Sequence, residues 1–103
     1  MKYDIRFPTQ RLEKYFDEFL KKEVSHRNLR VKIASEINEL ADNPRPFHKK
    51  SFTEIKPPIG VHNYRAEYRL RIADYRVLFN VDDKQRIVWL LDIRRRSEKT
   101  YKR

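Results

Sequence analysis

The last forty residues constrain the fold more than any other part of this sequence. In residues 64–72 apolar and charged side chains alternate, and after the tight turn at residues 73–74 the alternation resumes in residues 75–81. A period of two is typical of a strand with one buried face. A second turn at residues 82–85 leads into the nearly apolar run 87–93, which suits a central strand covered on both sides. Three strands joined by tight turns predict an antiparallel meander.

Two amphipathic helices are predicted upstream of this meander. Apolar side chains recur every three or four positions in residues 10–22 and again in residues 28–41. The short polar link between them favours a helical hairpin. Alternation in residues 3–7 predicts a first strand, which Pro8 ends, and Thr9 is the expected N-cap of the first helix.

Residues 43–63 have the least regular pattern. They hold four of the five prolines and the single glycine. We expect a long loop here, anchored to the body by Phe47, Phe52 and Ile55. A loop of this length without its own secondary structure is often functional.

The expected fold is α+β, in the order β-α-α-β-β-β, with the N-terminal helical hairpin packed on one face of an antiparallel meander sheet. The length of 103 residues suits one domain spanning residues 1–103, and the sequence has neither a repeat nor a composition boundary. No apolar run approaches the roughly 20 residues that cross a bilayer. The first ten residues contain no apolar signal core, so we expect a cytoplasmic protein without membrane contact.

The composition excludes several kinds of chemistry. The chain has no cysteine, which excludes a disulfide scaffold, a thiolate metal site and a cysteine nucleophile. One glycine is too few for a glycine-rich phosphate loop. The three histidines have no metal-site spacing, so we expect no metal and no cofactor, although His48 and His62 lie where a loop histidine could reach an active site.

The charge points to a polyanionic partner. The net charge is +10, and residues 65–103 carry twelve basic and six acidic side chains. A small, strongly basic domain favours nucleic acid or an acidic protein as its partner.

Four arginines are expected on one face of the meander. Arg65, Arg69 and Arg71 share a strand face by alternation, and Arg76 joins them across the next turn. Like charges this close repel, whereas a bound phosphate would compensate them. A solvated strand face with Glu67 as internal counter-charge explains the same pattern.

Residues 64–101 resemble the RelE/ParE toxin superfamily of type II toxin–antitoxin systems. The resemblance rests on Tyr68-Arg69-Leu70-Arg71, the turn, Asp74-Tyr75-Arg76-Val77, the acidic turn, the apolar strand and a basic segment that ends in Tyr101. The order of elements predicted above is also the order of that superfamily.

The resemblance implies a ribosome-dependent endoribonuclease that cuts mRNA in the A site by 2′-hydroxyl attack without a metal. Its catalytic positions fall on Arg69, Arg71, Arg76, Arg95 and Tyr101. Arg71 and Arg76 would clamp the scissile phosphate, Arg95 would stabilise or protonate the leaving oxygen, and Tyr101 would stack on a base. Further RNA contacts are expected from Arg65, Arg94, Arg96 and Lys99.

The resemblance leaves the general base open, although Glu54 lies roughly where some relatives have a catalytic glutamate. Arg69 and Arg71 stand where a relative has lysines, and arginine essentially never loses its proton. Glu67, on the same strand face, and Glu54, in the preceding segment, are the two candidates, and the terminal histidine that some relatives use as an acid is absent.

Two other functions fit the same sequence. A ParE-like toxin would inhibit DNA gyrase by protein binding and needs no catalytic residues, and a basic RNA- or ribosome-binding protein without activity would show the same charge. The superfamily also implies a cognate acidic antitoxin, which a net charge of +10 suits.

Overall fold

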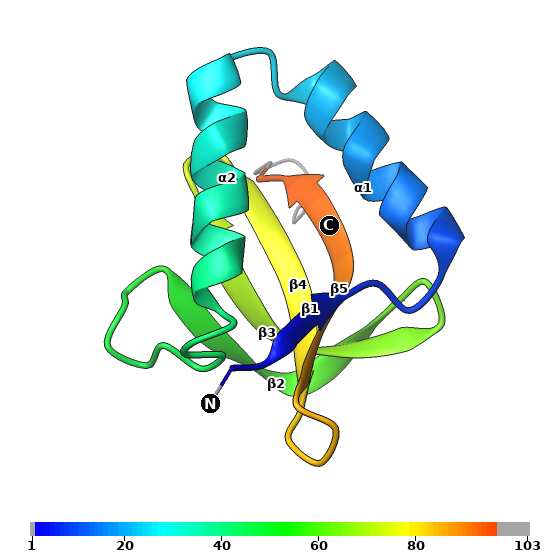
Figure 1. Cartoon of the computed structure of the whole chain (residues 1–103), viewed down its shortest axis with the longest axis vertical. Helices are drawn as coiled ribbons and strands as arrows, with labels where there is room; N and C mark the ends of the chain where they lie inside the picture. Colours follow the sequence, from blue (N-terminus) through cyan, green and yellow to red (C-terminus); the bar gives the residue numbers. More distant parts are fainter. Residues whose placement is uncertain (1, 97–103) are drawn as a thin grey trace.

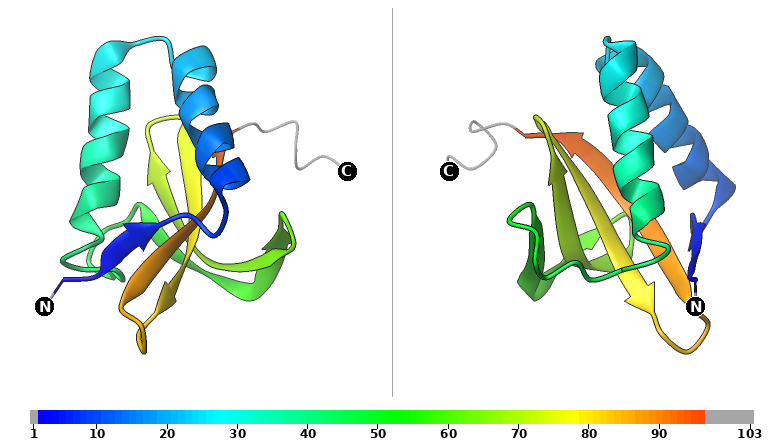
Figure 2. Two further views of the ribbon diagram at one scale, coloured as in Figure 1. Left: turned by 45° about the vertical axis from the view of Figure 1, so that its right-hand side comes forward. Right: turned by 60° about the vertical axis from the view of Figure 1, so that its left-hand side comes forward.

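The computed structural model describes residues 2–96, which form one mixed sheet covered on one face by two helices (Figures 1 and 2). The sheet has five strands in the order β1-β5-β4-β3-β2. The elements are β1 (Asp4–Arg6), α1 (Gln10–Glu23), α2 (Arg27–Glu39), β2 (Phe52–Val61), β3 (Tyr64–Ile72), β4 (Tyr75–Asp82) and β5 (Ile87–Arg95). The predicted α+β class, with a helical hairpin on one face of the sheet, is confirmed.

The first strand gives the sheet its mixed character. Ile5 of β1 pairs in parallel with Val88 of β5, whereas the three later strand pairs are antiparallel. A parallel pair requires a long connection, and β1 and β5 are joined only through the two helices and the three strands that lie between them in the chain. Thr9 caps α1 as predicted, since its hydroxyl accepts a hydrogen bond of 3.1 Å from the Leu12 N–H.

The expectation of a loop over residues 43–63 is wrong in its second half. Phe52–Val61 forms β2, an edge strand paired with β3. Pro57 and Pro58 lie inside this strand, where the pairing register shifts between Glu54 and Ile59. Proline lacks an N–H to donate to the ladder, and an edge strand with an irregularity tolerates that loss.

The helices bury one side of the sheet in a main core. Phe16 of α1 and Ile33 of α2 pack with Val77, Phe79 and other fully buried strand residues. No helix in the described part of the chain is long and apolar enough to span a membrane.

A smaller apolar cluster occupies the other side of the sheet. It contains Val61, Ala66, Leu78 and Leu91. Leu78 follows Val77 in β4, so its side chain lies on the opposite face. The tip of the β2–β3 hairpin therefore packs against β4 and β5 on the face that the helices leave open.

A β-bulge in β5 changes which residues face each side. Leu78 pairs with Asp92, but the next residue, Phe79, pairs with Leu90, so Leu91 is an extra residue on β5. Before the bulge the even-numbered Leu90 packs in the helix-side core, whereas after the bulge the odd-numbered Ile93 packs there. Beyond the bulge the odd-numbered residues of β5 therefore face the helices and the even-numbered residues face the open side.

Candidate active site

Arginines from three neighbouring strands meet on the sheet face opposite the helices. Arg71 of β3 lies directly across from Arg76 of β4, and Arg76 lies directly across from Arg94 of β5. Arg69 precedes Arg71 by two residues and therefore projects from the same face. Leu70, between them, belongs to the helix-side core. The predicted grouping of Arg69, Arg71 and Arg76 is present.

Arg76 is at the centre of this group. Its pKa is lowered from the ordinary value, first by burial and then by four neighbouring guanidinium groups. In decreasing order of effect these belong to Arg69, Arg96, Arg71 and Arg94. Arginine nevertheless stays protonated at physiological pH, so the cluster retains its mutual repulsion. An anion bound among these side chains would relieve that repulsion.

A hollow of about 100 Å³ lies between the cluster and β2. Cationic and hydroxyl side chains line it together: Lys50, Ser51, Thr53, Arg69, Arg71 and Arg76. Thr53 is the register partner of Arg69, and the Arg71 N–H donates a hydrogen bond of 2.9 Å to the Ser51 carbonyl. Ammonium, guanidinium and hydroxyl donors are the groups that bind phosphate oxygens in nucleic-acid interfaces.

Lys50, Ser51 and Thr53 were missed by reasoning from the sequence. They join the site because β2 pairs with β3, and the two nearby prolines obscured that strand. The aromatic–β-branched pair Phe52-Thr53 was the available signal for a strand start.

Arg95 does not join the cluster. Its Nη2 donates a hydrogen bond of 3.1 Å to the Glu23 carbonyl of α1 and lies 3.5 Å from the Glu23 carboxylate. Its guanidinium lies 5.3 Å from the centre of the Tyr75 ring. The structure therefore does not bring Arg95 together with Arg71 and Arg76, because the bulge at Leu91 directs odd-numbered residues of β5 toward the helices.

Arg94 lies on the open side instead, opposite Arg76 in the β4–β5 pair. Arg96, just after β5, lines a hollow of about 410 Å³ together with Arg71 of β3 and with Lys32 and Glu36 of α2. Arg65 lies farther along β3, opposite Gly60 near the hairpin tip. Lys99 and Tyr101 lie outside the described residues.

The two candidate general bases lie on neighbouring strands. Glu67 of β3 lies two residues before Arg69, and its N–H donates a hydrogen bond of 2.7 Å to the Asn80 side chain. Glu54 follows Thr53, which lines the cationic hollow, and therefore projects from the other side of β2, with Lys56 3.8 Å away. Ala66 packs in the smaller cluster on the open side and Tyr68 packs in the helix-side core, so β3 is irregular at Glu67 and alternation does not assign a face to its side chain.

A buried carboxylate lies beside the cluster. Asp92 is 3% exposed, and its Oδ2 accepts hydrogen bonds from Arg94 Nε at 2.8 Å and Nη2 at 2.6 Å. Its Oδ1 lies 3.2 Å from His62 Nε2, in the turn between β2 and β3. Sequence reasoning passed over Asp92 inside an apolar strand, although a single acidic residue in such a run was a usable signal.

Tyr15 of α1 completes the surroundings of this carboxylate. Its ring lies 5.5 Å from the His62 ring, and its hydroxyl donates a hydrogen bond of 3.1 Å to the Ile93 carbonyl. Burial and the negative charge of Asp92 raise the pKa of the Tyr15 hydroxyl. The hairpin turn, β5 and α1 therefore meet at Asp92.

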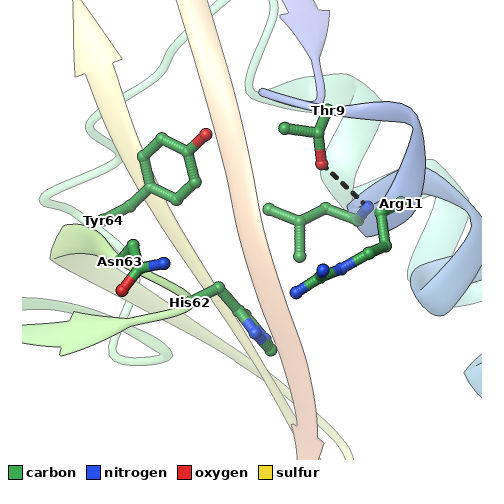
Figure 3. A pocket seen from close by; sticks show the side chains of 6 residues that line it. Thr9, Arg11, His62, Asn63 and Tyr64 are labelled. Atoms are coloured by element: carbon green, nitrogen blue, oxygen red, sulfur yellow. Dashed lines mark hydrogen bonds between the residues drawn. The ribbon is translucent and has the colours of Figure 1, made fainter.

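A second hollow, of about 240 Å³, opens beside the hairpin turn (Figure 3). Thr9 and Arg11, at the start of α1, form one wall, and His62, Asn63 and Tyr64 form the other. His62, which the sequence placed in a loop that could reach an active site, lies at this turn beside Asp92. The residues that line this hollow are different from those of the cationic hollow.

Solved structures of toxins share this fold. The chain aligns with one chain of an archaeal RelE–RelB complex from Pyrococcus horikoshii, with 19% identity, a TM-score of 0.67, and coverage of 95% of this chain and 99% of the other. The RelBE2 toxin–antitoxin complex from Mycobacterium tuberculosis aligns with 19% identity, a TM-score of 0.54, and coverage of 93% and 100%. A mutant of E. coli RelE in the free state aligns with 18% identity, a TM-score of 0.55, and coverage of 98% and 92%. The fold is therefore that of the RelE-like toxins.

A comparison with models of protein families shows which family the chain belongs to. Residues 9–100 match the ParE toxin family of the type II toxin–antitoxin system parDE. The chain belongs to this family, and so to the RelE/ParE superfamily that the motifs of residues 64–101 predicted. A comparison with curated proteins found no significant match.

Proposed function

We propose that this toxin is an endoribonuclease that cleaves mRNA on the ribosome. The observation that carries the proposal is the meeting of Arg69, Arg71, Arg76 and Arg94 on one open sheet face. Like charges placed this close do not stabilise a fold, so a phosphate-bearing ligand accounts for them better than solvent does.

The chemistry proposed is transfer of a phosphodiester within one strand. The 2′-hydroxyl forms a bond to the adjacent phosphorus while the bond from phosphorus to the 5′-oxygen breaks, which leaves a 2′,3′-cyclic phosphate and a 5′-hydroxyl. Negative charge builds up on the phosphorane-like transition state. Arg71 and Arg76, which flank the cationic hollow, would stabilise that charge, and a single preorganised donor is typically worth about 10²–10³ in rate.

Two protons must move in this reaction. Glu67 is the preferred base for the 2′-hydroxyl because it lies two residues from Arg69 on β3, whereas Glu54 projects from the side of β2 opposite to Thr53 and the cationic hollow. Arg94 or Arg96 takes the role that the resemblance gave to Arg95, which is to stabilise the leaving oxygen. Tyr101 keeps its proposed role of stacking on a base.

An acidic antitoxin is the proposed protein partner. Two of the structurally similar proteins are toxins in complex with their antitoxins. A net charge of +10 favours association with an acidic chain. The mRNA in the ribosomal A site is the proposed substrate.

Inhibition of DNA gyrase is the second candidate function. It is favoured by the family model, which describes the ParE toxin of parDE. A gyrase inhibitor works by protein binding and requires no phosphate site, whereas the converging arginines favour RNA. A non-catalytic RNA- or ribosome-binding protein is the third reading of the same charge.

Induced expression with primer extension on cellular mRNA separates these functions. We expect codon-phased cuts that require translation, loss of the cuts in Arg76→Ala, and full retention in Arg27→Ala, which removes the same charge from an exposed position on α2. Intact mRNA with filamentous cells and a DNA-damage response would instead indicate gyrase. Growth arrest without cuts or DNA damage would indicate binding without catalysis.

A further inference from the structure

Asp92 is the only buried charged side chain among residues 2–96. Burying a carboxylate is costly, and the pairing that compensates the cost often stabilises a protein no more than an apolar residue would. A buried carboxylate of this kind can instead serve to fix the positions of the side chains that contact it.

Both carboxylate oxygens of Asp92 are engaged, each with a different part of the molecule. Oδ2 accepts the two hydrogen bonds from Arg94, at 2.8 and 2.6 Å, and Oδ1 faces His62 at 3.2 Å. The carboxylate thus connects a side chain of the arginine cluster with the turn of the β2–β3 hairpin.

The two hydrogen bonds to Asp92 fix the orientation of the Arg94 guanidinium. Arg94 is directly opposite Arg76, and its positive charge is among those that act on Arg76. A guanidinium has five N–H donors, of which Asp92 takes one from Nε and one from Nη2. Three donors stay available on the remaining edge for a phosphate.

The contact with His62 fixes the hairpin. His62 and Asn63 form its turn with left-handed φ values of 50° and 72°. The His62 ring packs on Tyr15 at a centroid distance of 5.5 Å, so the turn is held between α1 and β5. The same hairpin carries Arg69 and Arg71 on β3. Its attachment to β5 therefore helps to fix where these two arginines lie relative to Arg94.

We infer that Asp92 is a positioning residue for the RNA site: it orients the Arg94 guanidinium toward a phosphate next to Arg76 and anchors the β2–β3 hairpin through His62. This inference rests on the proposed function. Removing a negative charge near an RNA site should by itself strengthen RNA binding. The inference predicts the opposite for Asp92, because loss of its carboxylate would leave Arg94 and the hairpin less well positioned.

The test measures binding of a single-stranded RNA oligonucleotide at several salt concentrations. Asp92→Asn is expected to weaken binding about tenfold, as loss of a charge-assisted hydrogen bond does. The slope of log K against log salt should become about 0.7 shallower, which corresponds to one lost phosphate contact on a single strand. In an Arg94→Ala background Asp92→Asn should weaken binding by less than it does in the wild type, because only the attachment of the hairpin through His62 is left to lose.

Asp83→Asn is the matched control. It also removes one negative charge and an arginine-paired carboxylate, but at the far end of β4, where Asp83 accepts hydrogen bonds from Arg45 at 3.0 and 3.1 Å. We expect Asp83→Asn to leave the slope unchanged. Equal or tighter RNA binding by a folded Asp92→Asn variant would overturn the inference.

If Asp92→Asn does not fold, Arg94→Lys tests the same inference. The Arg94 side chain is partly exposed and lysine keeps its charge, so this variant is expected to fold. Lysine lacks the fork that bonds Asp92 and phosphate together, so we expect about tenfold weaker binding, whereas wild-type affinity would contradict the inference. Arg76→Ala distinguishes a failure of this inference from a failure of the proposed function. If Arg76→Ala does not weaken RNA binding, or if the wild-type protein binds no RNA, the proposed function fails first.

Discussion

Arg71 of β3 and Arg76 of β4 are direct register partners, separated in the chain by a turn whose Ala73 adopts a left-handed φ of 55°. Two guanidinium groups are thereby placed opposite each other on an exposed sheet face. Like charges placed directly opposite each other repel, and a bound phosphate would compensate that repulsion. Stability and RNA binding should therefore respond to mutation at this pair in opposite directions.

Arg71→Glu tests that opposition. The new carboxylate faces Arg76, so we expect the free energy of unfolding to rise by about 0.2–1 kcal/mol in urea titrations. RNA cleavage in cells should be lost because the phosphate clamp now contains a negative charge. Arg71→Ala serves as the control, with lost cleavage and a smaller gain in stability. A variant that is both destabilised and fully active would refute the assignment of the pair.

Arg95→Ala and Arg94→Ala should have different effects although the two residues are adjacent. Arg95 contacts Glu23 and Tyr75 on the helix side, so its loss should lower the free energy of unfolding by up to about 1 kcal/mol and spare RNA binding. Arg94→Ala should weaken RNA binding. Thermal unfolding and RNA titration of both variants check this, and the reverse pattern would restore Arg95 to the site.

Asp83 should contribute to stability in a pH-dependent way. Hydrogen bonds from Arg45 and then from Tyr3 lower the pKa of its carboxyl group. A lowered pKa in the folded state gives stability that is present above the ordinary value of about 3.9 and is lost as the pH falls through the folded-state value. Asp83→Asn should therefore be less stable at neutral pH and should lose less stability on acidification. Denaturation series from pH 7 to pH 2 measure the difference, and parallel curves would argue against it.

Thr9→Ala should destabilise the protein by about 1 kcal/mol, because the N–H of Leu12 loses its hydrogen-bond acceptor. Thr9→Ser, which retains the hydroxyl, is expected to stay within a few tenths of a kcal/mol of wild type. Urea denaturation of both variants distinguishes loss of the cap from any other effect of changing this side chain. Equal destabilisation by both would exclude the cap as the cause.

Leu78→Ala should destabilise the protein by about 2–5 kcal/mol, since Leu78 is 2% exposed in the smaller core. Hydrogen exchange should also accelerate in residues 61–66, because the hairpin tip packs on this side chain. Val31→Ala, at an exposed position of α2, is the control for a lost aliphatic group. Unchanged protection of the hairpin tip would indicate that this cluster does not hold it.

The periodicity of the sequence determined the helices, the three strands of the meander and the face shared by Arg69, Arg71 and Arg76. Those properties depend on repeats of two or 3.6 residues within one segment, which can be read locally. The strand β2 was missed because Pro57 and Pro58 are poor strand formers, and its place depends on the free edge of β3.

The tertiary structure alone decided which basic residues of β5 reach the cluster. A regular strand continuing from Leu90 would place Arg95 on the open face and Arg94 on the helix side. One extra residue at Leu91 reverses this, because side chains alternate and a shift of one position exchanges the two faces. The same shift places Asp92 beside Arg94 on the open side, within reach of His62 from a distant turn. Such an arrangement depends on how β4, β5 and the hairpin pack together, and no local pattern in the sequence specifies it.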